Sequence, residues 1–95
     1  DVYKRQYYHH LNSEIILVAG LYDEGRCVCV TKKSVKPISD IHNRQPLLLE
    51  ESQAEKWING DYILRDNLSK NIQIHRVSTY VNSPKNNDVN CLRPK

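Results

Sequence analysis

The chain has 95 residues, a net charge of +3 and a negative mean hydropathy, with a single Trp and no Phe or Met. This length allows one small domain and excludes two. Its longest apolar run, residues 15–19, is far too short to cross a bilayer, so we expect no membrane span. Residues 67–95 carry five Lys or Arg against one Asp. Such a basic segment fits either an anionic partner such as nucleic acid or a solvated tail.

The number and spacing of the cysteines indicate a reducing compartment. Three is an odd number, and no signal peptide is recognisable. Cys27 and Cys29 share one face of a predicted strand and are not expected to bridge each other, while Cys91 lies in a loop-like tail. We therefore expect an intracellular protein, which would be nuclear if the source is eukaryotic.

We interpret residues 1–6 separately from the rest of the chain. Their sequence, DVYKRQ, back-translates to a string that resembles the transposon end used in sequencing-library preparation. We interpret residues 1–6 as an adapter artefact and residues 7–95 as the biological sequence, with a true N-terminus that lies further upstream.

The first half of the chain is rich in strand formers and in turn residues. Residues 14–22 are apolar at nearly every position, which predicts a central strand buried on both faces. In chain order we expect a strand over 7–11, a turn at Asn12 and Ser13, the buried strand over 14–22, a tight turn over 23–25 and a strand over 26–31. The last three elements form a β-hairpin.

The second half mixes loops, helices and strands. The pattern predicts a loop over 34–43, a buried strand over 47–49 after Pro46, a helix over 51–59, a helical stretch over 61–69, a strand over 72–79 and an extended or looped tail from Tyr80. In the first helix Trp57 and Ile58 are expected to face the core, and Gly60 is expected to end the helix. The order of elements is typical of an α+β fold.

His42 is the histidine that the sequence places best for chemistry. It stands in the polar segment 40–46, between two predicted strands. An imidazole can exchange protons near neutral pH, and Arg44, two residues on, can bind a phosphate. From the residues alone another interpretation stays open, in which His42 caps a loop carbonyl and Arg44 pairs with Asp40.

The remaining histidines do not form a metal site by spacing. His9 and His10 are adjacent in a predicted strand, so they point to opposite faces and cannot chelate one ion together. His75 alternates with isoleucines and is expected at a surface or an interface. The sequence contains no zinc-type Cys/His spacing and no glycine-rich nucleotide motif. We therefore expect neither a metal nor a cofactor.

Four blocks in order resemble the SOS response-associated peptidase (SRAP) family. They are AGLYD at 19–23, SDIHNRQP at 39–46, VSTYVNSPKNN at 77–87 and CLRP at 91–94. The second block is similar to the I-H-x-R-M-P signature of the family, with Gln45 in place of its Met. The ordered set spans residues 7–95 and is closer to the eukaryotic, HMCES-like members than to the bacterial ones.

The resemblance implies a fold and an activity. The fold is an α+β domain with a strongly bent, antiparallel β-barrel-like core and short peripheral helices. The activity is a covalent thiazolidine crosslink between an N-terminal cysteine and an abasic site in single-stranded DNA, which protects the site during repair. In the family this cysteine, an asparagine and a glutamate lie upstream of the segment matched by residues 7–95. The resemblance therefore implies that residues 7–95 are the C-terminal part of one domain, inactive without its N-terminal half and monomeric when complete.

The resemblance also implies roles for individual residues. His42 corresponds to the histidine that helps to open the sugar and exchange protons, and Arg44 to the arginine that binds a backbone phosphate. We expect Arg76, Lys85 and Asn82 to contact the same DNA. Two alternatives remain: a non-catalytic module that binds modified or damaged DNA, and a cysteine-type peptidase acting on its own N-terminus.

Overall fold

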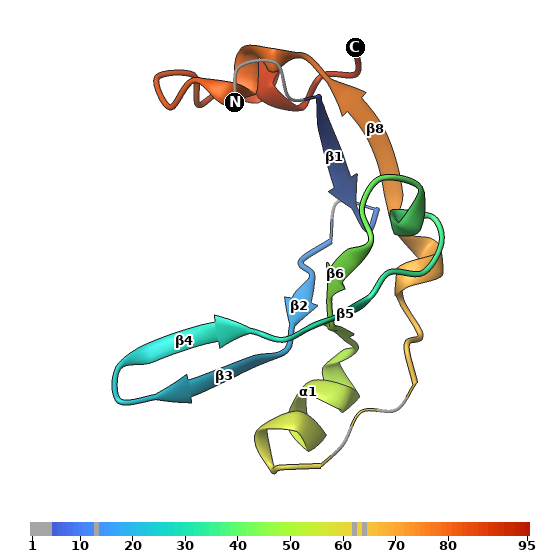
Figure 1. Ribbon diagram of the computed structural model, residues 1–95, viewed down its shortest axis with the longest axis vertical. Helices are drawn as coiled ribbons and strands as arrows, with labels where there is room; N and C mark the ends of the chain where they lie inside the picture. The colour runs from blue at the N-terminus through green and yellow to red at the C-terminus, as the bar shows by residue number, and fades with distance from the viewer. Residues whose placement is uncertain (1–4, 13, 62, 64) are drawn as a thin grey trace.

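The computed structural model describes residues 5–12, 14–61, 63 and 65–95, and Figure 1 shows their arrangement. The strands are β1 (Gln6–His10), β2 (Leu17–Val18), β3 (Gly20–Asp23), β4 (Arg26–Cys29), β5 (Thr31–Lys33), β6 (Arg44–Pro46), β7 (Leu48–Leu49) and β8 (Gln73–Val77). The helices are α1 (Glu51–Ile58) and the 3-10 turns η1 (Ile38–Asp40), η2 (Ser69–Asn71), η3 (Thr79–Asn82) and η4 (Val89–Leu92). This mixture confirms the predicted α+β class.

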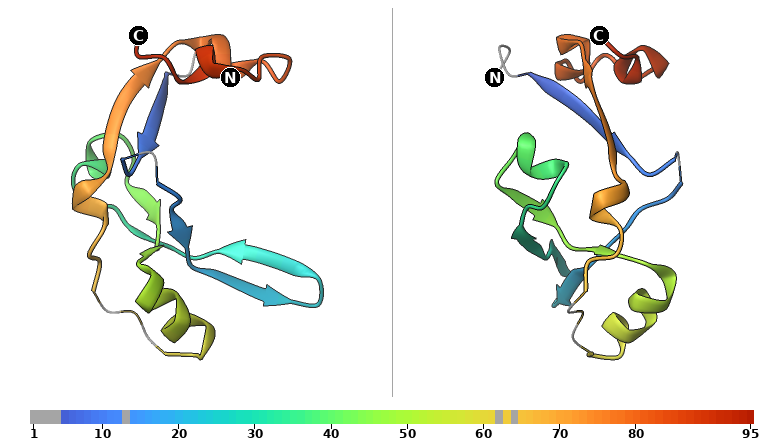
Figure 2. Two further views of the ribbon diagram at one scale, coloured as in Figure 1. Left: turned by 180° about the vertical axis from the view of Figure 1, so that it is seen from behind. Right: turned by 90° about the vertical axis from the view of Figure 1, so that its right-hand side faces the viewer.

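The described strands pair as four separate two-stranded antiparallel sheets: β1 with β8, β2 with β7, β3 with β4, and β5 with β6. No closed barrel forms within the described part of the chain. The molecule is extended, with the β1–β8 pair at one end, α1 at the other and the β3–β4 hairpin projecting to the side (Figures 1 and 2).

The β1–β8 pair confirms the strands predicted over 7–11 and 72–79. Its register places Tyr7 opposite Arg76 and His9 opposite Ile74 on one face. On the other face the rings of Tyr8, His10 and His75 gather, with centroids 5.1 to 6.1 Å apart. The two adjacent histidines of β1 therefore do face opposite ways. The turn predicted after this strand is seen at Asn12, whose φ is 49°; Ser13 lies outside the described residues.

The predicted hairpin is confirmed as β3–β4. Asp23 pairs with Arg26, so Glu24 and Gly25 form a two-residue loop. Both have positive φ values, 48° and 79°. Positive φ at both central positions is the type I′ geometry that matches the twist of the flanking strands, and glycine adopts it at little cost.

The buried strand predicted over 14–22 is wrong in two respects. The segment is divided into β2 and β3 at Ala19, which is fully buried and changes partners there: its N–H donates to Leu47 O and its carbonyl accepts from Val30 N. The side chains around this division are largely exposed, Ile15 at 87% and Tyr22 at 77%. Apolar composition predicted burial on both faces, but the described part of the chain leaves Ile15, Leu21 and Tyr22 exposed.

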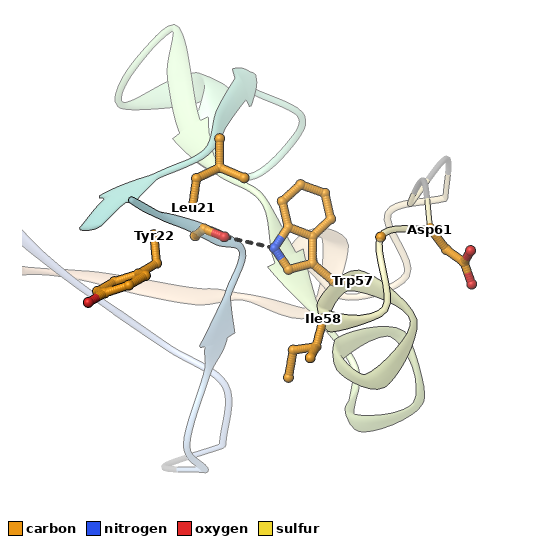
Figure 3. Close-up of a pocket in the computed structure, with 7 residues that line it drawn as sticks. Leu21, Tyr22, Trp57, Ile58 and Asp61 are labelled. Carbon is orange, nitrogen blue, oxygen red and sulfur yellow. Dashed lines mark hydrogen bonds between the residues drawn. The ribbon is translucent and has the colours of Figure 1, made fainter. Parts of the chain in front are cut away.

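Helix α1 confirms the helix predicted over 51–59. Gln53 Oε1 accepts the N–H of Glu50 at its start, and Gly60, with φ of 90°, ends it. Trp57 packs half-buried beside β3, and its indole N–H donates to Gly20 O at 2.9 Å (Figure 3). The prediction that Ile58 faces the core is wrong, because 82% of Ile58 is exposed.

The helical stretch predicted over 61–69 is also wrong for its described residues; Tyr62 and Leu64 lie outside them. Asp66 Oδ1 accepts the backbone N–H groups of Leu68 and Ser69 at 3.2 and 2.9 Å. An aspartate that captures N–H groups two and three residues ahead competes with the helical hydrogen bonds of the same backbone. The chain instead forms only the short turn η2 at the end of this stretch.

A small apolar core joins these elements. Leu11, Ile38, Leu48 and Ile72 are buried together, with Ile16, Leu68 and Ile74 packed against them. The predicted strand over 47–49 is confirmed as β7, which is fully buried. The tail returns to β8, since Lys95 N donates to Arg76 O at 2.8 Å. Within the described residues, no helix has both the length and the apolarity that a bilayer crossing needs.

Candidate functional site

Backbone hydrogen bonds fix the loop over residues 34–43, which carries His42. At its base Ser34 N donates to Asn43 O at 3.0 Å, where the β5–β6 ladder ends. Within the loop η1 makes one tight turn, and the N–H of His42 donates to Ile38 O at 3.0 Å. The buried Ile38 anchors this turn in the core. His42 therefore stands on a backbone whose path is fixed on both sides.

The imidazole of His42 has a hydrogen-bond partner for either protonation state of Nδ1. This atom lies 3.1 Å from the backbone nitrogen of Arg44 and 3.1 Å from the carbonyl oxygen of Arg44. When Nδ1 is unprotonated it accepts from the N–H, and when it is protonated it donates to the carbonyl. In a neutral imidazole the second form leaves Nε2 with a lone pair, the state that a general base requires. Capping of a loop carbonyl, the alternative raised from the sequence, thus describes one of these two states.

Arg44 is held on the same strand face as Thr31. Its guanidinium donates to Thr31 Oγ1 at 3.0 Å and is otherwise exposed. The alternative pairing of Arg44 with Asp40 is wrong, because Asp40 pairs with Lys36 at 3.0 Å. A guanidinium has five N–H donors, so this geometry leaves donors that can bind an anion.

His42 and Arg44 lie together at a cavity of about 510 Å³ beside the core. Its apolar lining includes Ile16, Val18, Ile38, Ile41, Pro46, Leu48 and Ile72. The basic and imidazole groups in the lining are Arg5, His9, His42 and Arg44. An apolar wall with a few polar groups from separate elements is the usual character of a ligand site. The cationic groups suit an anionic ligand.

The other predicted site residues lie at different distances from this cavity. Arg76 projects from the same face of the β1–β8 pair as Tyr7, which lines the cavity. Asn82 accepts a hydrogen bond from the side chain of Gln6, a second lining residue. Lys85 is exposed in the tail after η3 and does not line the cavity. The structure thus groups His42 with Arg44, places Arg76 and Asn82 beside other residues of the lining, and leaves Lys85 apart.

Two lining residues were missed from the sequence. His9 was interpreted as an ordinary strand residue, and Arg5 was set aside with residues 1–6. The signal for His9 was the alternation of β1, which puts it on the same face as Tyr7, opposite Ile74. Of the six residues set aside, Asp1, Val2, Tyr3 and Lys4 lie outside the described residues, while Gln6 begins β1 and pairs with Val77. The adapter origin of residues 1–6 stays a prediction.

A buried polar network, also missed from the sequence, lies behind the β5–β6 ladder. Gln45 and Ser69 are 2% and 0% exposed, and Gln45 Nε2 donates to Ser69 Oγ at 2.7 Å. Asp66 accepts hydrogen bonds from Ser69 and forms an ion pair with Lys32 at 2.9 Å. Burial raises the pKa of Asp66, but hydrogen bonds from Ser69, Lys32 and the backbone outweigh it and lower the pKa to about 2. Asp66 is therefore a charged anchor at neutral pH.

Two further cavities, of about 460 and 340 Å³, flank Trp57 between the hairpin and α1. Figure 3 shows the first, with Leu21 and Tyr22 on one side and Ile58 on the other. Neither lining contains a histidine or an arginine. Among the residues that the structure describes, no three His, Cys, Asp or Glu side chains gather as metal ligands. The cavity beside His42 is therefore the candidate site.

Comparison with known proteins gives a consistent result. The sequence profile of the SOS response associated peptidase (SRAP) family matches residues 2–84. The abasic site processing protein HMCES of Pongo abelii is 34% identical over 100 residues, and that of Mus musculus is 32% identical over 99 residues; each match covers 87% of this chain. The abasic site processing protein YoqW of Bacillus subtilis is 32% identical over 93 residues, covering 80% of this chain.

The matched region is only part of each relative. It covers 28% of the length of the two mammalian proteins and 42% of the bacterial one.

Proposed function

Because the chain belongs to the SOS response associated peptidase (SRAP) family, we propose that it is part of an abasic-site processing protein that crosslinks covalently to abasic sites in single-stranded DNA. The observation that carries the proposal is the position of His42 and Arg44 on one cavity, which puts a proton-exchanging group beside a phosphate-binding group. An abasic nucleotide has a reactive sugar, on which His42 could act, and adjacent phosphates, which Arg44 could bind.

The proposed chemistry is redox-neutral. The amine of an N-terminal cysteine adds to the ring-opened aldehyde and expels water, which gives a Schiff base. The thiol sulfur then bonds to the imine carbon, and the proton of the thiol passes to nitrogen as the thiazolidine closes. The cysteine belongs to a part of the domain outside residues 7–95, so this chain supplies the positioned acid–base group and the DNA contacts.

His42 has the geometry for the proton transfers. With hydrogen on Nδ1, which donates to the Arg44 carbonyl, Nε2 can take a proton from the sugar hydroxyl as the ring opens. The resulting imidazolium keeps the same hydrogen bond and can pass this proton to the ring oxygen as the C–O bond of the sugar ring breaks, which leaves a hydroxyl group and restores the neutral imidazole. The Arg44 carbonyl thus orients the imidazole of His42 both when it takes up a proton and when it releases one.

We propose that the rest of the SRAP domain covers the exposed apolar surface of this chain. Ile15, Tyr22 and Ile58 expose 77 to 87% of their surface, and large apolar groups of this kind mark contact surfaces when they cluster. The greater length of the relatives provides a source for the covering segment. In this proposal the complete domain is monomeric and closes the barrel-like core that the resemblance implies.

A non-catalytic DNA-binding module is the second candidate function. It is favoured by the hydrogen bond of His42 to Arg44, which also suits a histidine that only stiffens the loop. In that case the basic groups at the cavity would bind DNA and no bond would form.

The two candidates are separated by incubating full-length protein with single-stranded DNA that carries one abasic site. A denaturing gel should show an adduct that survives heat and detergent. Matched oligonucleotides with an intact base, or with a tetrahydrofuran residue that has no aldehyde, should give none. Binding of all three DNAs without an adduct on any of them would reject the crosslinking function in favour of the binding module.

A further inference from the structure

We propose that Gln45 is a positioning residue for His42, acting through the buried hydrogen bonds that tie the His42 loop to Ser69. The inference rests on the proposed function for the role of His42 in proton exchange. The hydrogen bonds from which it is argued do not involve DNA.

The first observation is that Gln45 fixes the loop at both ends. Its Oε1 accepts the backbone N–H of Val35 at 3.0 Å, just after β5. Its own backbone belongs to β6, just after Arg44. The segment between these points contains η1 and His42. A single buried side chain therefore bridges the start and the end of the loop.

The second observation is that the bridge is itself anchored. Gln45 Nε2 donates to Ser69 Oγ at 2.7 Å, and Asp66 Oδ1 accepts from the backbone N–H of Ser69 at 2.9 Å. Asp66 reaches back to Lys32, which is the cross-strand partner of Gln45. The contacts form a closed circuit from Gln45 through Ser69, Asp66 and Lys32 to Gln45 again. A network with its members satisfied resists displacement better than one isolated bond.

The third observation is that the two faces of the β5–β6 ladder carry different side chains with different contacts. Lys32 and Gln45 point to one face, toward residues 66–69. The alternate positions, Thr31 and Arg44, share the opposite face, where the guanidinium of Arg44 bonds to Thr31. One face thus anchors the ladder while the other presents the guanidinium of Arg44. Because Nδ1 of His42 bonds to the backbone of Arg44, a shift of residue 45 moves its partner.

The family signature that the sequence resembles has Met where this chain has Gln45. A methionine of similar length can fill the space, but its sulfur is only a weak acceptor for Val35 N–H and it has no donor for Ser69 Oγ. Gln45→Met is therefore a size-matched change that removes the polar bridge. Ser69→Ala removes the acceptor for Nε2 and leaves Gln45 itself in place, so it tests the same bridge if Gln45→Met fails to fold.

The control is Asp40→Asn, which removes the exposed ion pair with Lys36 in the same loop. Exposed pairs of this kind contribute little, so this variant should leave the ring of His42 where it is.

The test measures the ring ¹⁵N chemical shifts of His42 in full-length protein without DNA, together with the crosslinking rate at saturating abasic DNA. We expect Gln45→Met and Ser69→Ala to change the tautomer balance of His42 and to lower the saturating rate by about 10-fold or more, within the range that misplacement of a reacting group by about 1 Å produces. Asp40→Asn should match the wild type in both measurements.

Unchanged ring shifts in a folded Gln45→Met or Ser69→Ala protein would overturn the proposal, and so would an equal change in Asp40→Asn. If the wild-type protein forms no crosslink, the proposed function fails, while the ring shifts still decide whether Gln45 positions His42.

Discussion

The Nδ1 atom of His42 lies 3.1 Å from both the backbone nitrogen and the carbonyl oxygen of Arg44. The residue proposed to exchange protons and the residue proposed to bind phosphate are thus joined through one stretch of backbone. A DNA phosphate bound by Arg44 would therefore act on the residue whose backbone orients His42. The first prediction concerns this phosphate contact.

Arg44→Ala in the full-length protein should weaken binding to single-stranded DNA of any sequence. One phosphate contact fewer should also make the dependence of log K on log salt less steep by about 0.7. The measurement is a salt titration of binding by fluorescence anisotropy. Lys56→Ala, which removes one charge from the far end of α1, is the matched control and should keep the wild-type slope. An unchanged slope in Arg44→Ala would remove Arg44 from the interface.

The pH dependence of stability should depend on Asp66. The pKa of this carboxyl is lowered from 3.8 to about 2 in the folded protein, so its ionised form stabilises the fold above about pH 4. That contribution, about 2 kcal/mol, should be lost as pH falls from about 4 to 2. Asp66→Asn should remove most of this dependence and lower stability at neutral pH.

This prediction is checked by denaturant unfolding of wild type and variant between pH 2 and 7. Asp61→Asn, at an exposed position after α1, is the control and should leave the acid limb of the stability curve in place. An acid limb of equal size in Asp66→Asn would show that other carboxyls account for it.

Residues 7–95 expressed alone should be poorly stable and prone to aggregate. Large apolar groups on the hairpin and α1 are exposed, and both edges of β3–β4 lack a further strand among the described residues. Thermal unfolding followed by circular dichroism should be broad and accompanied by precipitation. A sharp, reversible transition above about 50 °C, as complete mesophile domains show, would contradict the expectation.

The elements that the sequence predicted correctly are those set by local chemistry. The turn at Glu24 and Gly25 and the helix end at Gly60 depend on backbone preferences that neighbouring residues reveal. The β1 strand followed from a run of aromatic residues and the β8 strand from alternation, although their mutual pairing did not. The predicted site pair lies two residues apart, with His42 at the end of the loop and Arg44 at the start of β6, so their proximity followed from their spacing.

The elements that were predicted wrongly depend on contacts that composition does not encode. Asp66 captures two backbone N–H groups and prevents a helix whose apolar spacing was otherwise suitable. The burial expected for residues 14–22 needs a covering layer, and no local pattern identifies its source. His9 reaches the cavity from β1, 33 residues before His42, and the partner of Gln45 is 24 residues away.

His42→Ala tests the central claim most directly. A positioned general acid–base group contributes about 10²–10⁴-fold to proton transfer, so the loss should appear in the formation and reversal of the crosslink. Binding of intact single-stranded DNA should change little, because Arg44 remains. His75→Ala is the matched control: His75 lies on the other face of the β1–β8 pair from Tyr7 and bonds to Leu92 O.

The measurement is a time course of crosslink formation and release on abasic single-stranded DNA, read on a denaturing gel, with wild type and both variants side by side. The account predicts rates for His42→Ala that are at least about 100-fold slower, and rates for His75→Ala near those of the wild type. Wild-type rates for His42→Ala would mean that His42 only caps its loop, and they would contradict the assignment.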